Sequence, residues 1–222
     1  MKDHIREKPL VALLIAIVLL LVAFPYVQGA LPGDVLLNLL QAAIVIAVVS
    51  VVSTHLKYTV AAVLLGLLSL LSGWVPRSAE HSVVFLVGGW SAMAFYAFAV
   101  LLIALHLLRE DQVTLSTLCG ALCGYLLLGF LWTEAYDLIE FQHPRSIVWA
   151  NSSLGRPGWS DLLYFSFTTL TSAGYGDISP VTPQSRSAAL LESVSGVFYV
   201  AVMISRLVGL HITDHRNKGG TA

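Results

Sequence analysis

Charged residues are scarce in this sequence of 222 residues: Asp, Glu, Lys and Arg make up 11% of the chain, whereas hydrophobic residues make up 57%. A soluble globular protein carries about 25% charged residues, so a soluble enzyme, a nucleic-acid-binding protein and a disordered protein are excluded. The formal net charge of −1 gives no general attraction to nucleic acid. Cysteine is also rare. The two present, Cys119 and Cys123, lie in an apolar run, and we interpret them as small packing residues rather than as a redox or metal site.

Long apolar runs fill most of the chain, as a membrane-spanning helix requires. Six spans are predicted, at about 9–27, 35–54, 58–75, 82–108, 114–133 and 184–209. If the N-terminus is inside, eight of the 12 basic residues lie on inner flanks, in agreement with the positive-inside rule. We therefore expect a multi-pass protein of the cell (plasma) membrane with cytoplasmic N- and C-termini. A cleaved signal peptide in place of the first span is the alternative.

A segment of about 50 residues separates the fifth and sixth spans, which is too long for a simple turn. Its apolar stretch at 162–170 is too short to span a membrane but suits a re-entrant half-helix. We expect Ser160 to be its N-cap and Asp161 to complement the positive end of the helix dipole. Such a helix would direct its negative C-terminal end toward the membrane centre, where it would stabilise a cation.

The sequence Ser172-Ala173-Gly174-Tyr175-Gly176 follows this helix. Successive carbonyls line one axis only if alternate residues take conformations that glycine accepts at little steric cost, and two glycines have that spacing. Non-helical backbone at membrane depth is tolerated only where it is buried in protein or lines an aqueous path. On such a path, the carbonyl oxygens could replace the hydration shell of an ion.

The run from Thr168 to Asp177, Thr-Thr-Leu-Thr-Ser-Ala-Gly-Tyr-Gly-Asp, resembles the pore signature of the tetrameric potassium channels. The resemblance covers about 112–212 and includes the order outer helix, pore helix, filter and inner helix. Together with the six predicted spans, it implies an all-α membrane protein of six transmembrane helices, with a re-entrant pore helix and selectivity filter between helices five and six. Because one chain supplies a quarter of each ring, it also implies a homotetramer of four copies in the lipid bilayer.

The function implied by the resemblance is passive, potassium-selective conduction through a carbonyl-lined filter, without enzymatic activity. Strong voltage gating is not expected, because the fourth span lacks the regularly spaced arginines of a voltage sensor. We expect a four-helix peripheral domain at 1–110, a pore domain at 111–212 and a short cytoplasmic tail at 213–222. The tail is too short for a large ligand-binding domain. K⁺ ions in the filter are expected, and an organic cofactor or a nucleic-acid partner is not.

The resemblance assigns a role to each residue of the pore. The backbone carbonyls of Ser172, Ala173, Gly174 and Tyr175, with the Ser172 hydroxyl, would bind K⁺, and Gly176 completes the filter. Tyr164, Thr171 and Asp177 would support the filter, with Tyr175 pointing away from the axis into an aromatic collar; a packing role is the alternative for Tyr164. Gly196 is at the family's hinge position, where close helix packing is an equally good interpretation. The candidates for the pore lining and gate are Val197, Val200, Ile204, Ser205, Val208 and Ile212.

Two sets of acidic residues have open interpretations. Glu192 lies inside the last span, where a carboxylate is a functional candidate, but we favour a structural role in which hydroxyls such as Ser166 or Thr169 satisfy it. Glu134, Asp137 and Glu140 share one helical face beyond the fifth span. They would either concentrate cations near the outer mouth or form a plain solvated turret.

Ser172-Ala173 departs from the Thr-Val that the potassium channels usually have at these positions. A weakly selective monovalent cation channel is therefore the nearest alternative function. A non-conducting membrane sensor or accessory subunit is the second.

Overall fold

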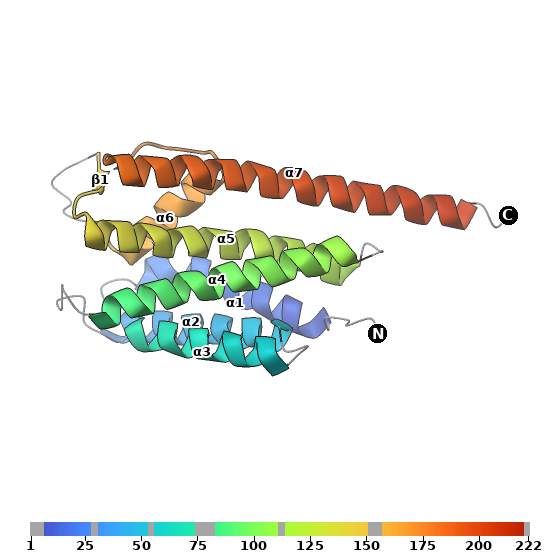
Figure 1. Ribbon diagram of the computed structural model, residues 1–222, viewed down its shortest axis with the longest axis horizontal. Helices are drawn as coiled ribbons and strands as arrows, with labels where there is room; N and C mark the ends of the chain where they lie inside the picture. Colours follow the sequence, from blue (N-terminus) through green and yellow to red (C-terminus); the bar gives the residue numbers. More distant parts are fainter. Residues whose placement is uncertain are drawn as a thin grey trace.

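In the computed structural model, the residues described are 7–27, 31–52, 56–73, 83–110, 114–150 and 157–219. They form seven helices and one two-stranded sheet (Figure 1). In chain order the elements are α1 (Glu7–Val27), α2 (Leu31–Val52), α3 (Leu56–Gly73), α4 (Val83–Arg109), α5 (Leu115–Gln142), β1 (Ile147–Trp149), α6 (Trp159–Leu170), β2 (Ile178–Pro180) and α7 (Pro183–Gly219). The predicted helical fold is confirmed, and the short sheet is an addition to it.

Each predicted span coincides with a helix, although the helices differ in length. Within the described side chains, three helices are long and apolar enough to cross a membrane: Val83–Arg109, Leu115–Gln142 and Pro183–Gly209. Shorter apolar helices cover Pro9–Ala23, Asn38–Val51 and Leu56–Leu71. The fifth helix continues beyond the predicted end at 133, and acidic residues of its last turns are buried, with Glu140 accepting hydrogen bonds from the loop that follows.

The first four helices pack onto the rest of the molecule through α5. In the bundle, α4 contacts both α3 and α5, and α1 contacts α2 and α5. One apolar core joins them, with Leu13 and Ile17 of α1, Phe95 of α4 and Leu127 of α5 fully buried. Helix α7 lies along the opposite side of α5 and extends beyond the other helices at its C-terminal end (Figure 1).

A second, smaller core lies beneath the sheet. Strands β1 and β2 pair antiparallel, with Val148 opposite Ser179. Ile147 and Ile178 point from the sheet into a cluster with Tyr136 of α5 and Phe165 of α6. The sheet therefore ties the loop after α5 to the loop before α7 and covers one end of α6.

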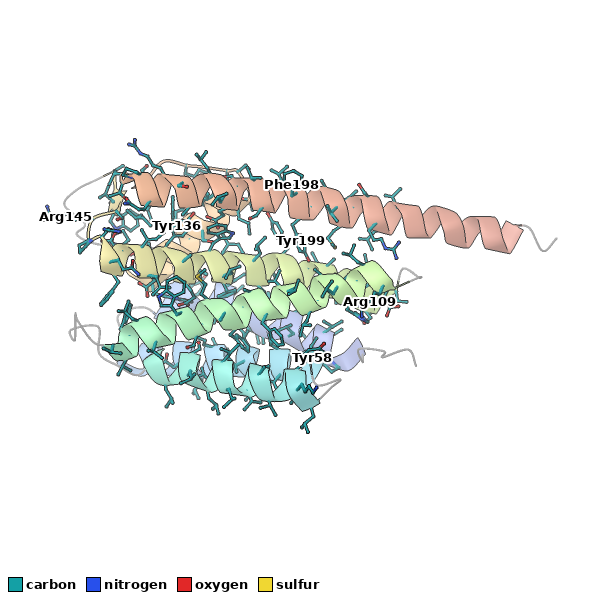
Figure 2. All side chains as sticks on the ribbon, in the orientation of Figure 1. Tyr58, Arg109, Tyr136, Arg145, Phe198 and Tyr199 are labelled. Atoms are coloured by element: carbon teal, nitrogen blue, oxygen red, sulfur yellow. The ribbon has the colours of Figure 1, made fainter. Side chains whose placement is uncertain are left out.

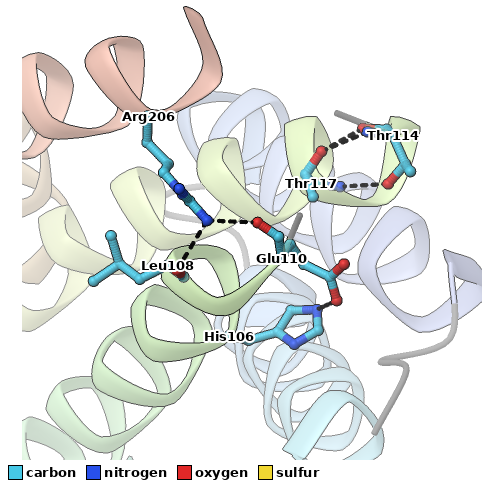
Figure 3. A network of polar contacts seen from close by, with 6 residues as sticks. All are labelled: His106, Leu108, Glu110, Thr114, Thr117 and Arg206. Carbon is cyan, nitrogen blue, oxygen red and sulfur yellow. Dashed lines mark hydrogen bonds and ion pairs between the residues drawn. The ribbon is translucent and has the colours of Figure 1, made fainter. Parts of the chain in front are cut away.

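The C-terminal end of α4 is held by a side chain of α7 (Figure 3). The last carbonyls of a helix have no partner within the helix. Here Arg206 Nη2 donates hydrogen bonds to the carbonyl oxygens of Leu108, at 3.1 Å, and Glu110, at 2.6 Å. His106 Nε2 and Glu110 Oε1 lie 3.4 Å apart beside them. Arg206 thus joins the peripheral helices directly to α7.

Candidate functional site

Helix α6 begins two residues earlier than the sequence predicts. Its N-cap is Gly158 rather than Ser160, and the Asp161 carboxylate accepts a 2.7 Å hydrogen bond from the Gly158 backbone N–H. The indole of Trp159 donates to Glu134 on α5 at 3.0 Å, which draws this residue into the helix. The predicted place of Asp161 in the first turn is confirmed.

The segment 172–176 begins directly beyond the C-terminal end of α6. The backbone N–H of Ser172 donates to Thr169 O at 2.9 Å, and those of Ala173 and Gly174 donate to Thr168 O at 2.8 and 3.1 Å. The free carbonyls at the end of the helix are thereby satisfied by the N–H groups of the segment. The helix fixes one side of the segment's backbone and leaves the carbonyl side open.

The backbone of this segment alternates in conformation. Left-handed φ angles occur at Ser172 (58°), Gly174 (51°) and Gly176 (79°). The two glycines behave as predicted from their spacing. The left-handed conformation of Ser172 was not predicted, and it costs roughly 1–2 kcal/mol in an L-residue. Within the described chain, the carbonyls of residues 172–175 accept no hydrogen bond, so the arrangement presents a row of unpaired oxygens.

Tyr164 braces the end of this segment nearest the sheet. Its ring stacks on that of Tyr175, with centroids 6.4 Å apart and planes within 6°. Desolvation, followed by the hydrogen bond to Asp177, raises the pKa of the Tyr164 hydroxyl, so this group keeps the proton that it donates. Asp177 Oδ1 also accepts from Ile178 N at 3.1 Å, and its carbonyl accepts from Ala150 N at 2.7 Å. Thr171 instead bonds within α6, where its hydroxyl donates to Phe167 O at 2.7 Å.

Two members of the acidic triplet on α5 are buried and hydrogen-bonded to neighbouring residues. Glu134 accepts a hydrogen bond from the Trp159 indole. Glu140 accepts hydrogen bonds from the backbone N–H groups of Arg145, at 2.7 Å, and Ile147, at 3.1 Å. Both carboxylates are buried. The solvated turret is therefore wrong for Glu134 and Glu140, whereas cation concentration stays a prediction. Glu140 instead fixes the turn into β1, where Arg145 has a left-handed φ of 70°.

Gly196 of α7 lies against the last residue of α6. A Cβ at this position would lie 2.2 Å from the carbonyl oxygen of Leu170, closer than real Cβ contacts occur. The same oxygen accepts a 3.3 Å hydrogen bond from the Tyr125 hydroxyl, and Ser193 Oγ donates to Thr169 O at 3.3 Å. Close packing, one of the two interpretations of Gly196, is thus present in the structure.

Glu192 of α7 is completely buried between three helices. Its Oε1 lies 2.6 Å from Ser166 Oγ on α6, and its Oε2 accepts a hydrogen bond from the Tyr136 hydroxyl on α5. The predicted hydroxyl partner Ser166 is confirmed, whereas no hydrogen bond between Thr169 and the Glu192 carboxylate occurs among the described residues. Tyr136, which lies between α5 and α7 (Figure 2), was missed, because nothing in the sequence aligns it with a residue 56 positions away.

The candidate lining residues of α7 are exposed in the single chain. Val197 is 60% exposed, Ile204 56% and Val208 52%, and Val200 and Ser205 are also exposed. The side chain of Ile212 lies outside the described residues. Exposed apolar residues such as Leu190 and Phe198 occur on other faces of the same helix, so exposure alone does not define one lining face.

Cys119 and Cys123 fit the packing interpretation. Both are buried free thiols, and Cys123 Sγ donates to Leu10 O at 3.5 Å. The neighbouring Gly124 admits the Tyr199 hydroxyl, which would lie 2.2 Å from a Cβ at this position. Among the described residues, no group of three or more His, Cys, Asp or Glu side chains is arranged to hold a metal ion.

A comparison with known protein families matches the part of the chain that contains α6 and residues 172–176. Residues 113–210 match the family model described as ion channel. No match was found among curated proteins or among solved structures. The matched family is one of ion channels and not of enzymes, and the apolar helices make this a membrane protein. The matched segment contains α5, α6 and the described part of α7 as far as residue 210, and it includes residues 172–176.

Proposed function

We propose that four copies of this chain form a potassium-selective channel that conducts K⁺ passively through the 172–176 segment. One observation carries the proposal: left-handed residues at 172, 174 and 176 alternate with Ala173 and Tyr175, and the carbonyls of residues 172–175 have no hydrogen-bond partner among the described residues. Residues 172–175 are exposed in the single chain, and four copies around one axis would bury their carbonyl oxygens, where an unpaired carbonyl is costly without water or an ion. Four such strands around one axis would surround a dehydrated ion with oxygens.

The surroundings of the segment support cation binding. Helix α6 ends at Leu170, directly before the segment, so its partial negative charge lies beside the proposed ion sites. Tyr164 and Tyr175 stack at the other side of the backbone, and Asp177 is anchored to the sheet. These contacts would hold the backbone of residues 172–176 at a fixed distance from the pore axis, and a pore of fixed width favours one ion size over another. The exposed hydroxyl of Ser172 supplies a further oxygen at the inner end.

The proposal extends to the rest of the chain. The three long helices and the three shorter apolar ones would all cross the membrane. Both termini would lie in the cytoplasm, as the positive-inside bias indicates. Residues 1–110 would form the peripheral domain and 111–212 the pore domain. The packing of Leu13 and Ile17 of α1 in the central core supports retention of the first span. Rings of Val197, Val200, Ile204 and Val208 on α7 would close the pore by dewetting.

The test is a flux assay on the purified protein reconstituted in K⁺-loaded liposomes. Barium is close to K⁺ in size and carries twice its charge, so it should enter the filter and remain there. We expect K⁺ efflux that barium blocks. Gly209→Ala serves as a matched control, because a Cβ at this position meets nothing within 4 Å, and it should conduct like the original protein. No flux in either protein would contradict the proposal and favour a sensor or accessory subunit.

A weakly selective monovalent cation channel is the second candidate. It is favoured by Ala173, whose small side chain is exposed and packs behind the backbone less firmly than a branched residue would. Bi-ionic reversal potentials separate the two candidates. A potential set by the K⁺ gradient alone supports potassium selectivity, and equal permeability to Na⁺ and K⁺ contradicts it.

A further inference from the structure

A chain of polar groups connects α5, α6 and α7 behind the proposed filter. Ser166 Oγ lies 2.8 Å from Gly129 O and 2.6 Å from Glu192 Oε1, and the Tyr136 hydroxyl donates to the other carboxyl oxygen. Ser166 and Glu192 are fully buried. Gly129 makes the approach possible, because a Cβ there would lie 2.7 Å from the Phe167 ring.

The number of protons in this chain determines the direction of its hydrogen bonds. A serine hydroxyl donates one proton, yet both neighbours of Ser166 Oγ, Gly129 O and Glu192 Oε1, are acceptors if Glu192 is ionised. One of the two contacts would then bring two oxygens together without a hydrogen between them. A proton on Glu192 resolves the conflict. Tyr136 then donates to Glu192 Oε2, Glu192 Oε1 donates to Ser166, and Ser166 donates to Gly129 O.

The charges around this site lead to the same conclusion. In the described part of the chain, no lysine, arginine or histidine pairs with Glu192, and the titratable groups facing it are the hydroxyls of Tyr136 and Tyr125 on α5. A buried carboxylate without a cationic partner is far more costly than a neutral acid. Two hydrogen bonds from neutral donors compensate only a part of that cost.

We propose that Glu192 is a neutral carboxylic acid whose proton is donated to Ser166, and that this hydrogen-bonded chain positions α6 relative to α5 and α7. The bridge meets α6 at Ser166, four residues before Leu170 and six residues before the start of the proposed filter at Ser172. Glu192 therefore acts as a positioning residue that puts no charge behind the ion sites. Its effect on conduction rests on the proposed function, whereas its protonation state does not.

Infrared difference spectroscopy tests the protonation state without requiring conduction. The full-length protein in lipid at neutral pH is compared with Glu192→Gln, whose amide can donate to Ser166 and accept from Tyr136 as the neutral acid does. The C=O stretch of a carboxylic acid is expected in the original protein and absent from the variant. In Tyr136→Phe the band should persist at a higher wavenumber, because the carbonyl loses its donor. If the difference spectrum shows carboxylate bands instead, or if Glu192→Gln fails to fold, the proposal is wrong.

The positioning role has a second readout in the reconstituted channel. Glu192→Ala removes the contacts with both Ser166 and Tyr136, and it should lower the K⁺-over-Na⁺ permeability ratio severalfold. Glu192→Gln keeps both contacts and should retain most of the ratio. A ratio that is equal in Glu192→Ala and the original protein would overturn the positioning role. If the original protein does not conduct, the proposed function fails while the infrared result still decides the state of Glu192.

Discussion

Replacing Gly196 by alanine tests how closely α7 supports the filter. The new Cβ would lie 2.2 Å from the Leu170 carbonyl oxygen and 3.0 Å from Leu170 Cδ1. Because the oxygen belongs to the backbone, α6 or α7 must move by about 1 Å to reach ordinary van der Waals contact. Overpacking of this kind costs about 1–3 kcal/mol, and the gain from replacing a helical glycine offsets about 0.5–1 kcal/mol of it.

We therefore expect Gly196→Ala to lower the free energy of unfolding by about 1–2 kcal/mol. The melting temperature of the purified protein would then fall by roughly 2–8 °C. Leu170 leads directly into the filter, so the K⁺-over-Na⁺ permeability ratio should fall as well. The matched control is Gly209→Ala in the same helix, where nothing lies within 4 Å of a Cβ. If Gly196 serves only as a hinge, Gly196→Ala would change opening but leave melting temperature and selectivity unchanged, and the packing argument would be refuted.

Three further substitutions test the filter and its supports. Gly176→Ala forces an L-residue into a φ of 79°, a strain of about 1–2 kcal/mol, and should reduce single-channel conductance; unaltered conductance would count against the alternating backbone. Tyr164→Phe keeps the ring stack but loses the hydrogen bond to Asp177, which contributes about 1 kcal/mol. Currents should therefore decay faster under sustained recording. Unchanged decay would mean that Tyr164 is only a packing residue. Glu140→Gln weakens the turn into β1 and should lower the melting temperature, while single-channel conductance at low salt stays the same. A fall in that conductance would support the cation-concentrating role instead.

The helices and the unusual backbone were predictable because each depends on local chemistry. Runs of apolar residues predict helices, and the spacing of Gly174 and Gly176 predicts alternating conformations. The left-handed Ser172 was not predicted, because its conformation is imposed by three N–H groups bonded to the end of α6. The start of that helix at Trp159 was missed for a similar reason, since its indole bonds to Glu134, 25 residues away.

The packing of the helices within the bundle could not be predicted from composition. Membrane helices are apolar all round, so the pattern does not say which face of α1 or α4 is buried. Two contacts join residues far apart in the sequence: the hydrogen bond from Arg206 to the carbonyl beyond the end of α4, and the one from Tyr136 to Glu192. The β1–β2 sheet had a weak local signal, in the β-branched pair Ile147-Val148, but no cue to its partner across the filter.

The central claim is that four copies of the 172–176 segment line one axis with their carbonyl oxygens. Single-particle electron microscopy of the purified protein in K⁺ tests it most directly. The expected result is a fourfold particle with ion density on the axis, between the levels of the Ser172 and Tyr175 carbonyls. A particle without a fourfold axis, or one in which this segment faces lipid, would contradict the account.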